Sequence, residues 1–85
     1  SEAILKGANL ENLDFPGINL WKADLQGANL KNTNLSSADM ARANLQDADL
    51  EGANLDAAIL KDAVLEGANI SAEQREQACW SDCRD

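Results

Sequence analysis

Cys79 and Cys83 are the side chains best suited to covalent chemistry, and they are the only two thiols in the sequence. A spacing of four fits disulfide geometry poorly inside a continuous helix, so a bridge requires the helix to end between them. Either the two residues form an intramolecular disulfide that pins the C-terminal tail, or they are free or buried thiols. A bridge would imply an oxidising compartment, such as a periplasm, a thylakoid lumen or the secretory route, and free thiols would suit the cytoplasm.

Carboxylates are the other abundant reactive groups, with 15 Asp and Glu against 7 Lys and Arg and a net charge of −8. The sequence has no His, no nucleophile–base pair, no phosphate-binding loop and no cluster of metal ligands. We therefore expect no catalytic, cofactor-binding or metal-binding residues, no cofactor, and no enzyme activity. The acidic balance disfavours direct nucleic-acid binding, and the absence of any apolar run near the roughly 20 residues needed to span a bilayer disfavours membrane insertion.

These groups sit on a repeat of five residues. Every fifth residue from Leu5 to Ile70 is large and apolar, at 14 positions without exception. Two residues earlier lies a small or apolar residue, usually Ala, and the residue between is Asn or Asp in 11 of the 14 units. Neither a helix nor a flat strand places a period of five on one face. A backbone that turns inward every five residues does, and four such turns close a square coil of 20 residues.

The motif Ala-(Asn/Asp)-Leu-x-x, as in residues 23–27, 28–32 and 53–57, resembles the pentapeptide-repeat family over residues 3–72. The resemblance implies an all-β solenoid, a right-handed quadrilateral β-helix with its Leu and Ala columns pointing inward. Fourteen units make about three and a half coils, or roughly 17 Å at the ordinary strand spacing. We expect the Asn and Asp column to face outward and to hydrogen-bond the local backbone at the turns.

The two ends differ in sequence. We expect residues 1–70 to form the β-helix and residues 71–85 a C-terminal cap, in which Ser71 and Gln74 form a capping box at the start of a short helix that runs to about Ala78 or Cys79. At the other end the repeat begins at once, so the first layer of large residues should be open to solvent. A missing segment, a second copy or another protein would cover that layer, which consists of Leu5, Leu10, Phe15 and Leu20.

Residues 11–22 depart most from the repeat, because larger side chains occupy the inner positions and Trp21 takes an outward one. The simpler interpretation is a repacked first coil with Trp21 lying over Ala41 and the stem of Arg42. The alternative is a docking site for a protein partner, formed by Phe15, Pro16, Trp21, Lys22 and Arg42. Near the other end, Ile59 and Val64 replace Asn or Asp, and the tail is expected to cover them through Trp80.

The function favoured by these features is a non-enzymatic interaction or scaffold module, since a walled solenoid offers surfaces for binding. The resemblance to Leu-rich, Asn/Asp-rich pentapeptide-repeat proteins of cyanobacteria and chloroplasts implies a subunit or assembly factor of a larger complex in a photosynthetic organism. The alternative, also implied by the resemblance, is an acidic mimic of DNA that binds DNA gyrase. The short rod and the mixed charges, with Lys22, Arg42 and Lys61 along one wall, weigh against it.

Overall fold

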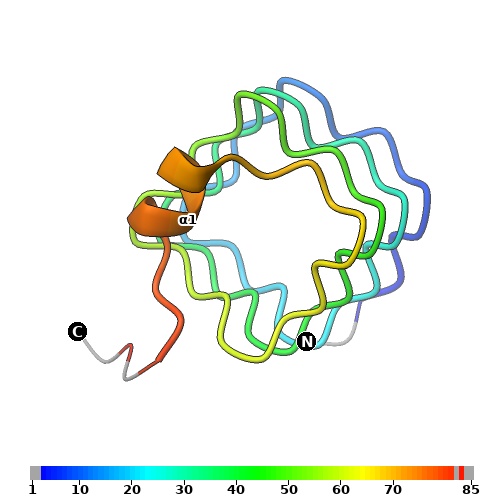
Figure 1. Ribbon diagram of the computed structural model, residues 1–85. Coiled ribbons are helices and arrows are strands. Elements are labelled where there is room, and N and C mark those ends of the chain that lie inside the picture. Colours follow the sequence, from blue (N-terminus) through cyan, green and yellow to red (C-terminus); the bar gives the residue numbers. More distant parts are fainter. Residues whose placement is uncertain (1–2, 82, 84–85) are drawn as a thin grey trace.

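The chain, described by a computed structural model for residues 3–81 and 83, winds into a stack of square coils (Figure 1). The first three coils comprise residues 3–22, 23–42 and 43–62, and a fourth begins at residue 63. Every β-bridge among the described residues is parallel and joins residues 20 apart, from Ile4 with Asp24 to Ile59 with Cys79. The 20-residue register predicted from the five-residue period is therefore confirmed.

Each coil has four short walls, and the middle residue of a wall makes the β-bridge. That residue directs both its N–H and its C=O toward the preceding coil. For example, Asp24 N donates to Ala3 O at 2.8 Å and Asp24 O accepts from Leu5 N at 2.7 Å. We name the walls after their first coil: wall A contains residues 3–5, wall B residues 8–10, wall C residues 13–15 and wall D residues 18–20, each with its equivalents 20 and 40 residues later.

A hydrogen-bonded β-turn forms every corner, as where Ala28 N donates to Leu25 O at 3.0 Å. Only the third residue of each turn has a positive φ, which defines type II turns. All five glycines of the sequence occupy this position. In the other turns an L side chain adopts the left-handed conformation, at a cost of about 1–2 kcal/mol each. These residues are Asn12, Lys22, Asn32, Ser37, Arg42, Asp47, Ala57 and Asp62.

The outward Asn and Asp side chains cap the turns, as predicted. Asn29 Oδ1 accepts the backbone N–H of Lys31 at 3.1 Å, and eight further middle residues repeat this contact two residues along the chain. Asp14 is an exception because the residue two positions on is Pro16, which has no N–H. Its carboxylate instead accepts from Asn34 Nδ2 in the next coil, at 2.7 Å.

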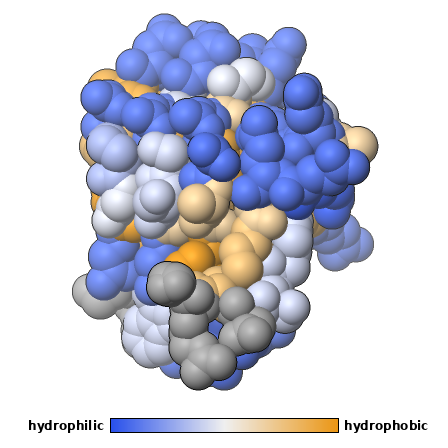
Figure 2. All heavy atoms as spheres, turned by 90° about the vertical axis from the view of Figure 1, so that its left-hand side faces the viewer, coloured by the Kyte–Doolittle hydropathy of each residue, from blue (hydrophilic) through white to orange (hydrophobic). Residues whose placement is uncertain are grey.

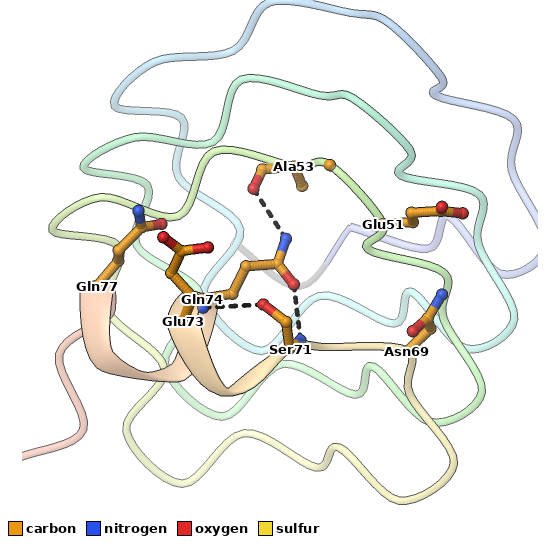
Figure 3. Close-up of a pocket in the computed structure, with 8 residues that line it drawn as sticks. Glu51, Ala53, Asn69, Ser71, Glu73, Gln74 and Gln77 are labelled. Carbon is orange, nitrogen blue, oxygen red and sulfur yellow. Dashed lines mark hydrogen bonds between the residues drawn. The ribbon is translucent and has the colours of Figure 1, made fainter.

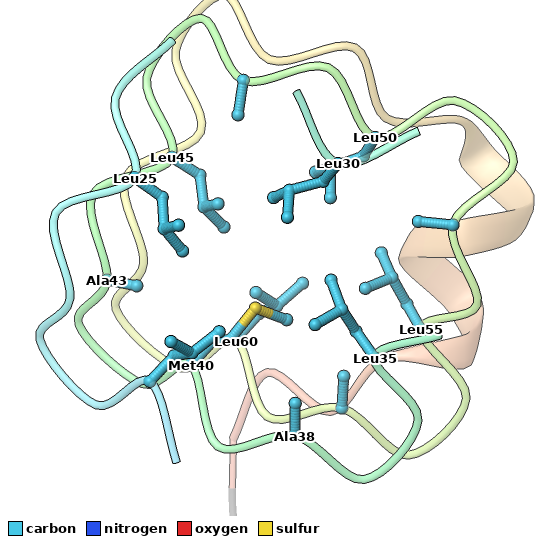
Figure 4. Close-up of a cluster of buried hydrophobic side chains, with 14 of the residues drawn as sticks. Leu25, Leu30, Leu35, Ala38, Met40, Ala43, Leu45, Leu50, Leu55 and Leu60 are labelled. Atoms are coloured by element: carbon cyan, nitrogen blue, oxygen red, sulfur yellow. The ribbon is translucent and has the colours of Figure 1, made fainter. Parts of the chain in front are cut away.

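The core consists of large and small apolar side chains that point inward (Figure 4). Inward side chains that are 20 residues apart stack on one another along the axis, and we call each such stack a file. Leu25 and Leu45 lie in one file and are fully buried, and Leu65 of the same file is half-buried. Thr33 stands where most units have Ala, and it is buried as well. Its hydroxyl is satisfied because Oγ1 donates to Leu10 O at 2.8 Å.

Helix α1 (Ala72–Gln77) interrupts the fourth coil and lies over one side of it (Figure 1). The predicted capping box is present, because Gln74 N donates to Ser71 Oγ and Ser71 N donates to Gln74 Oε1. The helix ends slightly earlier than the sequence predicts, with Ala78 as its C-cap. Cys79 then rejoins the stack on wall D, where its N–H donates to Ala58 O at 2.7 Å.

The C-terminal cap covers half of the last coil. Walls C and D of the third coil are sealed beneath α1 and the tail, and Leu55 and Leu60 are fully buried. On walls A and B the last inner residues, including Leu65 and Ile70, stay half-buried. Val64 is 46% exposed, so the expectation that the tail covers it is wrong. No helix among the described residues is long and apolar enough to cross a membrane.

Candidate interaction surfaces

The first coil forms an open layer at the N-terminal end of the stack. Leu5, Leu10 and Phe15 are half-buried, although Leu25, Leu30 and Leu35, the next members of the same files, are completely buried. Nearby, the side chains of Ile4 and Leu13 are 81% and 42% exposed. This end therefore presents apolar side chains to solvent, as expected for three of the four residues of the open layer.

Leu20, the fourth residue expected in that layer, is buried, with 4% of its surface exposed. The chain climbs along the solenoid axis as it turns, so Leu20 lies nearly one coil further along the axis than Leu5. We therefore define the open N-terminal layer as Leu5, Leu10 and Phe15. Asn9 and Asp14, the middle residues of walls B and C, border this layer, and their N–H groups have no backbone acceptor among residues 3–81 and 83.

A second surface lies on the corner between walls D and A, which we call the cationic corner: residues 21–22, 41–42 and 61–62. The structure places Trp21, Lys22 and Arg42, three of the five residues predicted to form a partner surface, on this corner. Phe15 belongs to the open layer and Pro16 to the corner between walls C and D, so neither shares this surface. Trp21 is 37% exposed, and the group over its ring is Lys22, with Nζ 4.6 Å from the ring centroid.

A hollow of about 320 Å³ opens beside the start of α1 (Figure 3). Gln74 reaches from the helix under this hollow, and its Nε2 donates to Leu50 O at 2.7 Å and Ala53 O at 2.9 Å. No buried side-chain polar atom of the described residues lacks a hydrogen-bond partner. The buried polar side-chain groups at the floor of the hollow are thus already satisfied by the protein itself. Sequence reasoning identified Gln74 only as a capping-box residue.

Electrostatics on wall B centre on Asp49. Its carboxylate accepts the N–H of Glu51 at 3.2 Å and Asn69 Nδ2 at 3.0 Å, and Lys31 Nζ lies 3.6 Å away. The pKa of Asp49 is lowered from its ordinary 3.8, chiefly by the backbone hydrogen bond from Glu51; desolvation opposes this effect, and Asn69 and Lys31 add smaller lowering contributions. These contacts make Asp49 a structural anion.

The tail is closed by a disulfide between Cys79 and Cys83, whose Cα atoms are 5.7 Å apart. Of the alternatives left by the sequence, the structure has the bridged one, and α1 ends before Cys79 as a bridge requires. Trp80 between them donates from Nε1 to Arg75 O at 2.7 Å. The α1 side of the molecule is mostly hydrophilic, with a smaller apolar area near the middle of this face (Figure 2).

Within residues 3–81 and 83, no three His, Cys, Asp or Glu side chains gather closely enough to hold a metal ion. The features that stand out are the open N-terminal layer and the cationic corner. Both are surfaces rather than enclosed sites, so the arrangement is suited to contacting other macromolecules.

Comparison with known proteins gives a consistent result. The family of pentapeptide repeats matches residues 3–41 and 38–72, with eight copies of the repeat. Among solved structures, the pentapeptide repeat protein Rfr23 from the cyanobacterium Cyanothece 51142 has a TM-score of 0.85 and 34% sequence identity, over 94% of this chain. Among curated proteins, no sequence matches the chain.

Two further pentapeptide repeat proteins come from the cyanobacterium Nostoc PCC 7120. The protein alr5209 is 47% identical over 84% of this chain, with a TM-score of 0.57. HetL, which is involved in heterocyst differentiation regulation, is 28% identical over 93% of this chain, with a TM-score of 0.50. The chain spans 55% of Rfr23, 63% of alr5209 and 45% of HetL. Such proteins form right-handed quadrilateral β-helices, in agreement with the coils described above.

Proposed function

The chain belongs to the pentapeptide-repeat family, and we propose that it is a non-enzymatic module that binds a protein through its open N-terminal layer. Pentapeptide repeat proteins are in general non-enzymatic structural modules. The observation that carries the proposal is the difference in burial between the first and second residues of the same file. Leu10 and Phe15 are half-buried, whereas Leu30 and Leu35 directly above them are fully buried.

A protein is the partner best suited to this layer, because both its side chains and its backbone are available. Apolar groups at the centre favour burial against another apolar surface. Around them, wall residues such as Asn9 and Asp14 offer the N–H groups that in later coils bond to the preceding coil. A partner that adds a strand to this edge would satisfy those groups. The occupant is another protein or a second copy of this chain.

We further propose that the protein works in an oxidising compartment, such as a thylakoid lumen or a periplasm. The supporting observation is the bridge between Cys79 and Cys83, since structural disulfides persist mainly outside reducing compartments. Thiol alkylation of source cells before lysis, followed by mass spectrometry of the tail peptide, tests this. The bridged peptide should dominate, and a tail recovered mostly alkylated at both thiols would place the protein in a reducing compartment.

The partner site is tested by photo-cross-linking in source cells. A cross-linking amino acid at Glu11, beside the open layer, should give one defined adduct, and the same group at Glu66, at the far end, should not. Phe15→Lys should abolish the adduct because it adds a charge to the apolar layer. Equal adducts from both positions, or none from Glu11, would contradict the proposal. Inhibition of gyrase supercoiling at stoichiometric protein would instead support the acidic DNA mimic.

A further inference from the structure

We infer that the cationic corner binds an extended, acidic segment of a partner protein. This surface lies on the outside of the first three coils and does not include the open N-terminal layer. The inference therefore goes beyond the proposed function and does not depend on it. It rests on the placement of three cations, on the backbone conformation that two of them adopt, and on the exposed indole beside them.

Backbone hydrogen bonds align the cations on consecutive coils. Lys22 N donates to Ala41 O at 2.9 Å, and Arg42 N donates to Lys61 O at 2.8 Å. Adjacent coils lie about 4.8 Å apart, so the three positively charged residues fall within roughly 10 Å along the axis. The whole chain carries a net charge of −8, whereas the residues of this corner carry more positive than negative charge.

These cations are available to a partner. The one salt bridge found among residues 3–81 and 83 joins Lys31 and Asp49 on another part of the surface. Asp62 lies on the corner itself, and Asp39 of wall D and Asp24 of wall A flank it. Asp39 Oδ1 already accepts the N–H of Ala41 at 3.1 Å, so it serves the turn. Asp24 Oδ1 likewise accepts the N–H of Gln26 at 3.2 Å. The corner itself thus holds three cations and the one carboxylate of Asp62, with one further carboxylate on each side of it.

The backbone at two of these cations is strained. Lys22 and Arg42 have φ values of 58° and 61°, in the left-handed region that favours glycine. They carry the longest side chains found at this turn position. The other corners hold shorter residues there: Gly7, Asn12, Gly17, Gly27, Asn32, Ser37, Asp47, Gly52, Ala57 and Gly67. Six other non-glycine residues adopt the same conformation at this turn position, so the long cationic side chains, and not the backbone conformation alone, distinguish this corner.

Trp21 supplies an apolar contact next to the charges. Its ring is 37% exposed and lies under the ammonium group of Lys22. Trp together with Arg is the composition that dominates binding energy at protein interfaces. A matching segment therefore carries carboxylates for the cations and an apolar side chain for the indole.

The corner fits a short stretch of extended chain. A strand rises about 3.3 Å per residue, so the roughly 10 Å occupied by the cations corresponds to about three residues. Carboxylates at alternate residues would face the corner together, and the long Lys and Arg stems can adjust to their spacing. A nucleic acid is less suitable, because its extended phosphate backbone would also meet the acidic remainder of this protein.

The test uses a fluorescein-labelled peptide of alternating aspartate and leucine, titrated against the intact chain at low salt. Binding should weaken when salt is raised from about 20 to 200 mM, because surface charges are screened. It should be lost when asparagine replaces aspartate in the peptide. Equal binding of the asparagine peptide would overturn the inference, and so would tighter binding of a single-stranded oligonucleotide of the same charge.

Two charge reversals locate the site. Arg42→Glu and Lys31→Glu change the net charge of the protein equally, so they have the same long-range effect. Arg42→Glu should weaken peptide binding at least tenfold, and Lys31→Glu less than twofold. Equal weakening by both variants would mean that the peptide senses only the overall charge, and the cationic corner would not be its site.

A glycine pair separates binding from folding. Arg42→Gly removes the left-handed strain together with the cation, so it should raise Tm by about 3 °C while it weakens peptide binding several-fold. Ala57→Gly makes the same backbone change on another corner, where φ is 61°, and it should raise Tm without affecting binding. Unchanged peptide affinity in Arg42→Gly would show that the Arg42 side chain does not bind the peptide, and it would contradict the inference.

Discussion

The two ends of the β-helix meet water in different ways. At the C-terminal end, α1 takes the place of wall C and the chain returns to the stack on wall D at Cys79, which leaves Leu55 and Leu60 fully buried. At the N-terminal end, Leu5 and Phe15 remain half-buried with no covering element in the part of the chain that the structure describes. Within the described residues, the repeat is therefore closed on walls C and D at the C-terminal end and open at the N-terminal end, and we call these the closed and the open end.

The difference shows how the backbone hydrogen-bonding groups of a terminal coil can be satisfied when no further coil follows. A middle residue at position 74 of a regular coil would send its backbone N–H to Ala53 O, as Asn54 N does to Thr33 O. In α1 that N–H is used for the capping box, and the side-chain amide of Gln74 reaches Ala53 O in its place. One side chain thus replaces the hydrogen bond of a missing strand. Among residues 3–81 and 83, no side chain accepts the N–H groups of Asn9 and Asp14 in this way.

The largest contrast between the ends should appear within a single file of the core. Leu50→Ala should lower the free energy of unfolding by about 3 kcal/mol, because it leaves a cavity in a fully buried layer. Leu10→Ala, in the same file at the open end, should lower it by about 1 kcal/mol, since part of that side chain is already in water. Urea denaturation of both variants measures the difference, and equal losses would contradict the described exposure of Leu10.

Removing the amide that replaces the missing strand should have the next largest effect. Gln74→Leu leaves the carbonyls of Leu50 and Ala53 without this donor and breaks the capping box. We expect a loss of about 2 kcal/mol. Gln77→Leu is the matched control, because it changes an exposed side chain of the same helix, and its effect should stay within about 0.5 kcal/mol. Similar losses in the two variants would show that only helix propensity is at work.

Opening the disulfide should loosen the closed end without reaching the open one. Cys83→Ala should cost about 1–2 kcal/mol, because the bridge closes only a short loop. Hydrogen exchange should become faster at Leu60, whose N–H donates to Cys79 O at 2.8 Å, and should be unchanged at Leu5. Ser81→Ala, inside the loop, is the control. Faster exchange at Leu5 would mean that the two ends unfold as one unit.

The smallest effect concerns the charge on wall B. The lowered pKa of Asp49 means that its ionised form stabilises the fold above about pH 3.8, and that this contribution is lost as the pH falls through the folded pKa. Asp49→Asn should therefore reduce the fall in Tm between pH 5 and pH 2.5, with Asp56→Asn as the control for losing one surface charge. An identical pH profile in both variants would contradict the role of Asp49. At the open end the same column holds neutral Asn9 and Asn29.

The repeating part of this structure was predictable from the sequence. A period of five with Leu, Ala and Asn or Asp in set places fixes the turn interval, the inward columns and the 20-residue register, because each unit has the same neighbours. The turn-capping role of residues such as Asn29 was predicted for the same reason. The capping box of Ser71 and Gln74 followed from a local motif that works within one turn of helix.

Features that occur once were not predictable. The contact of Gln74 with Ala53 depends on where α1 crosses the last coil, and no local pattern encodes that crossing. For Trp21 the sequence offered either packing over Ala41 and Arg42 or a docking site, and it did not indicate that the adjacent Lys22 places its ammonium group over the ring. The left-handed conformation of Lys22 and Arg42 has a signal in retrospect, because all five glycines share that position in the repeat. Leu20 is buried because the chain advances along the solenoid axis within each coil. The sequence pattern alone assigns the four large residues of a coil to one flat layer, so it does not show this difference.

Helix α1 also bears on aggregation. An uncovered terminal coil exposes backbone N–H and C=O groups to which the strands of another molecule can add. Continued parallel, in-register stacking of this kind is the geometry of an amyloid fibril. Because α1 is bulkier than a strand and Gln74 occupies the carbonyl of Ala53, the helix blocks the addition of a further strand to wall C. The helix therefore limits growth at that end, as capping repeats do in other solenoids.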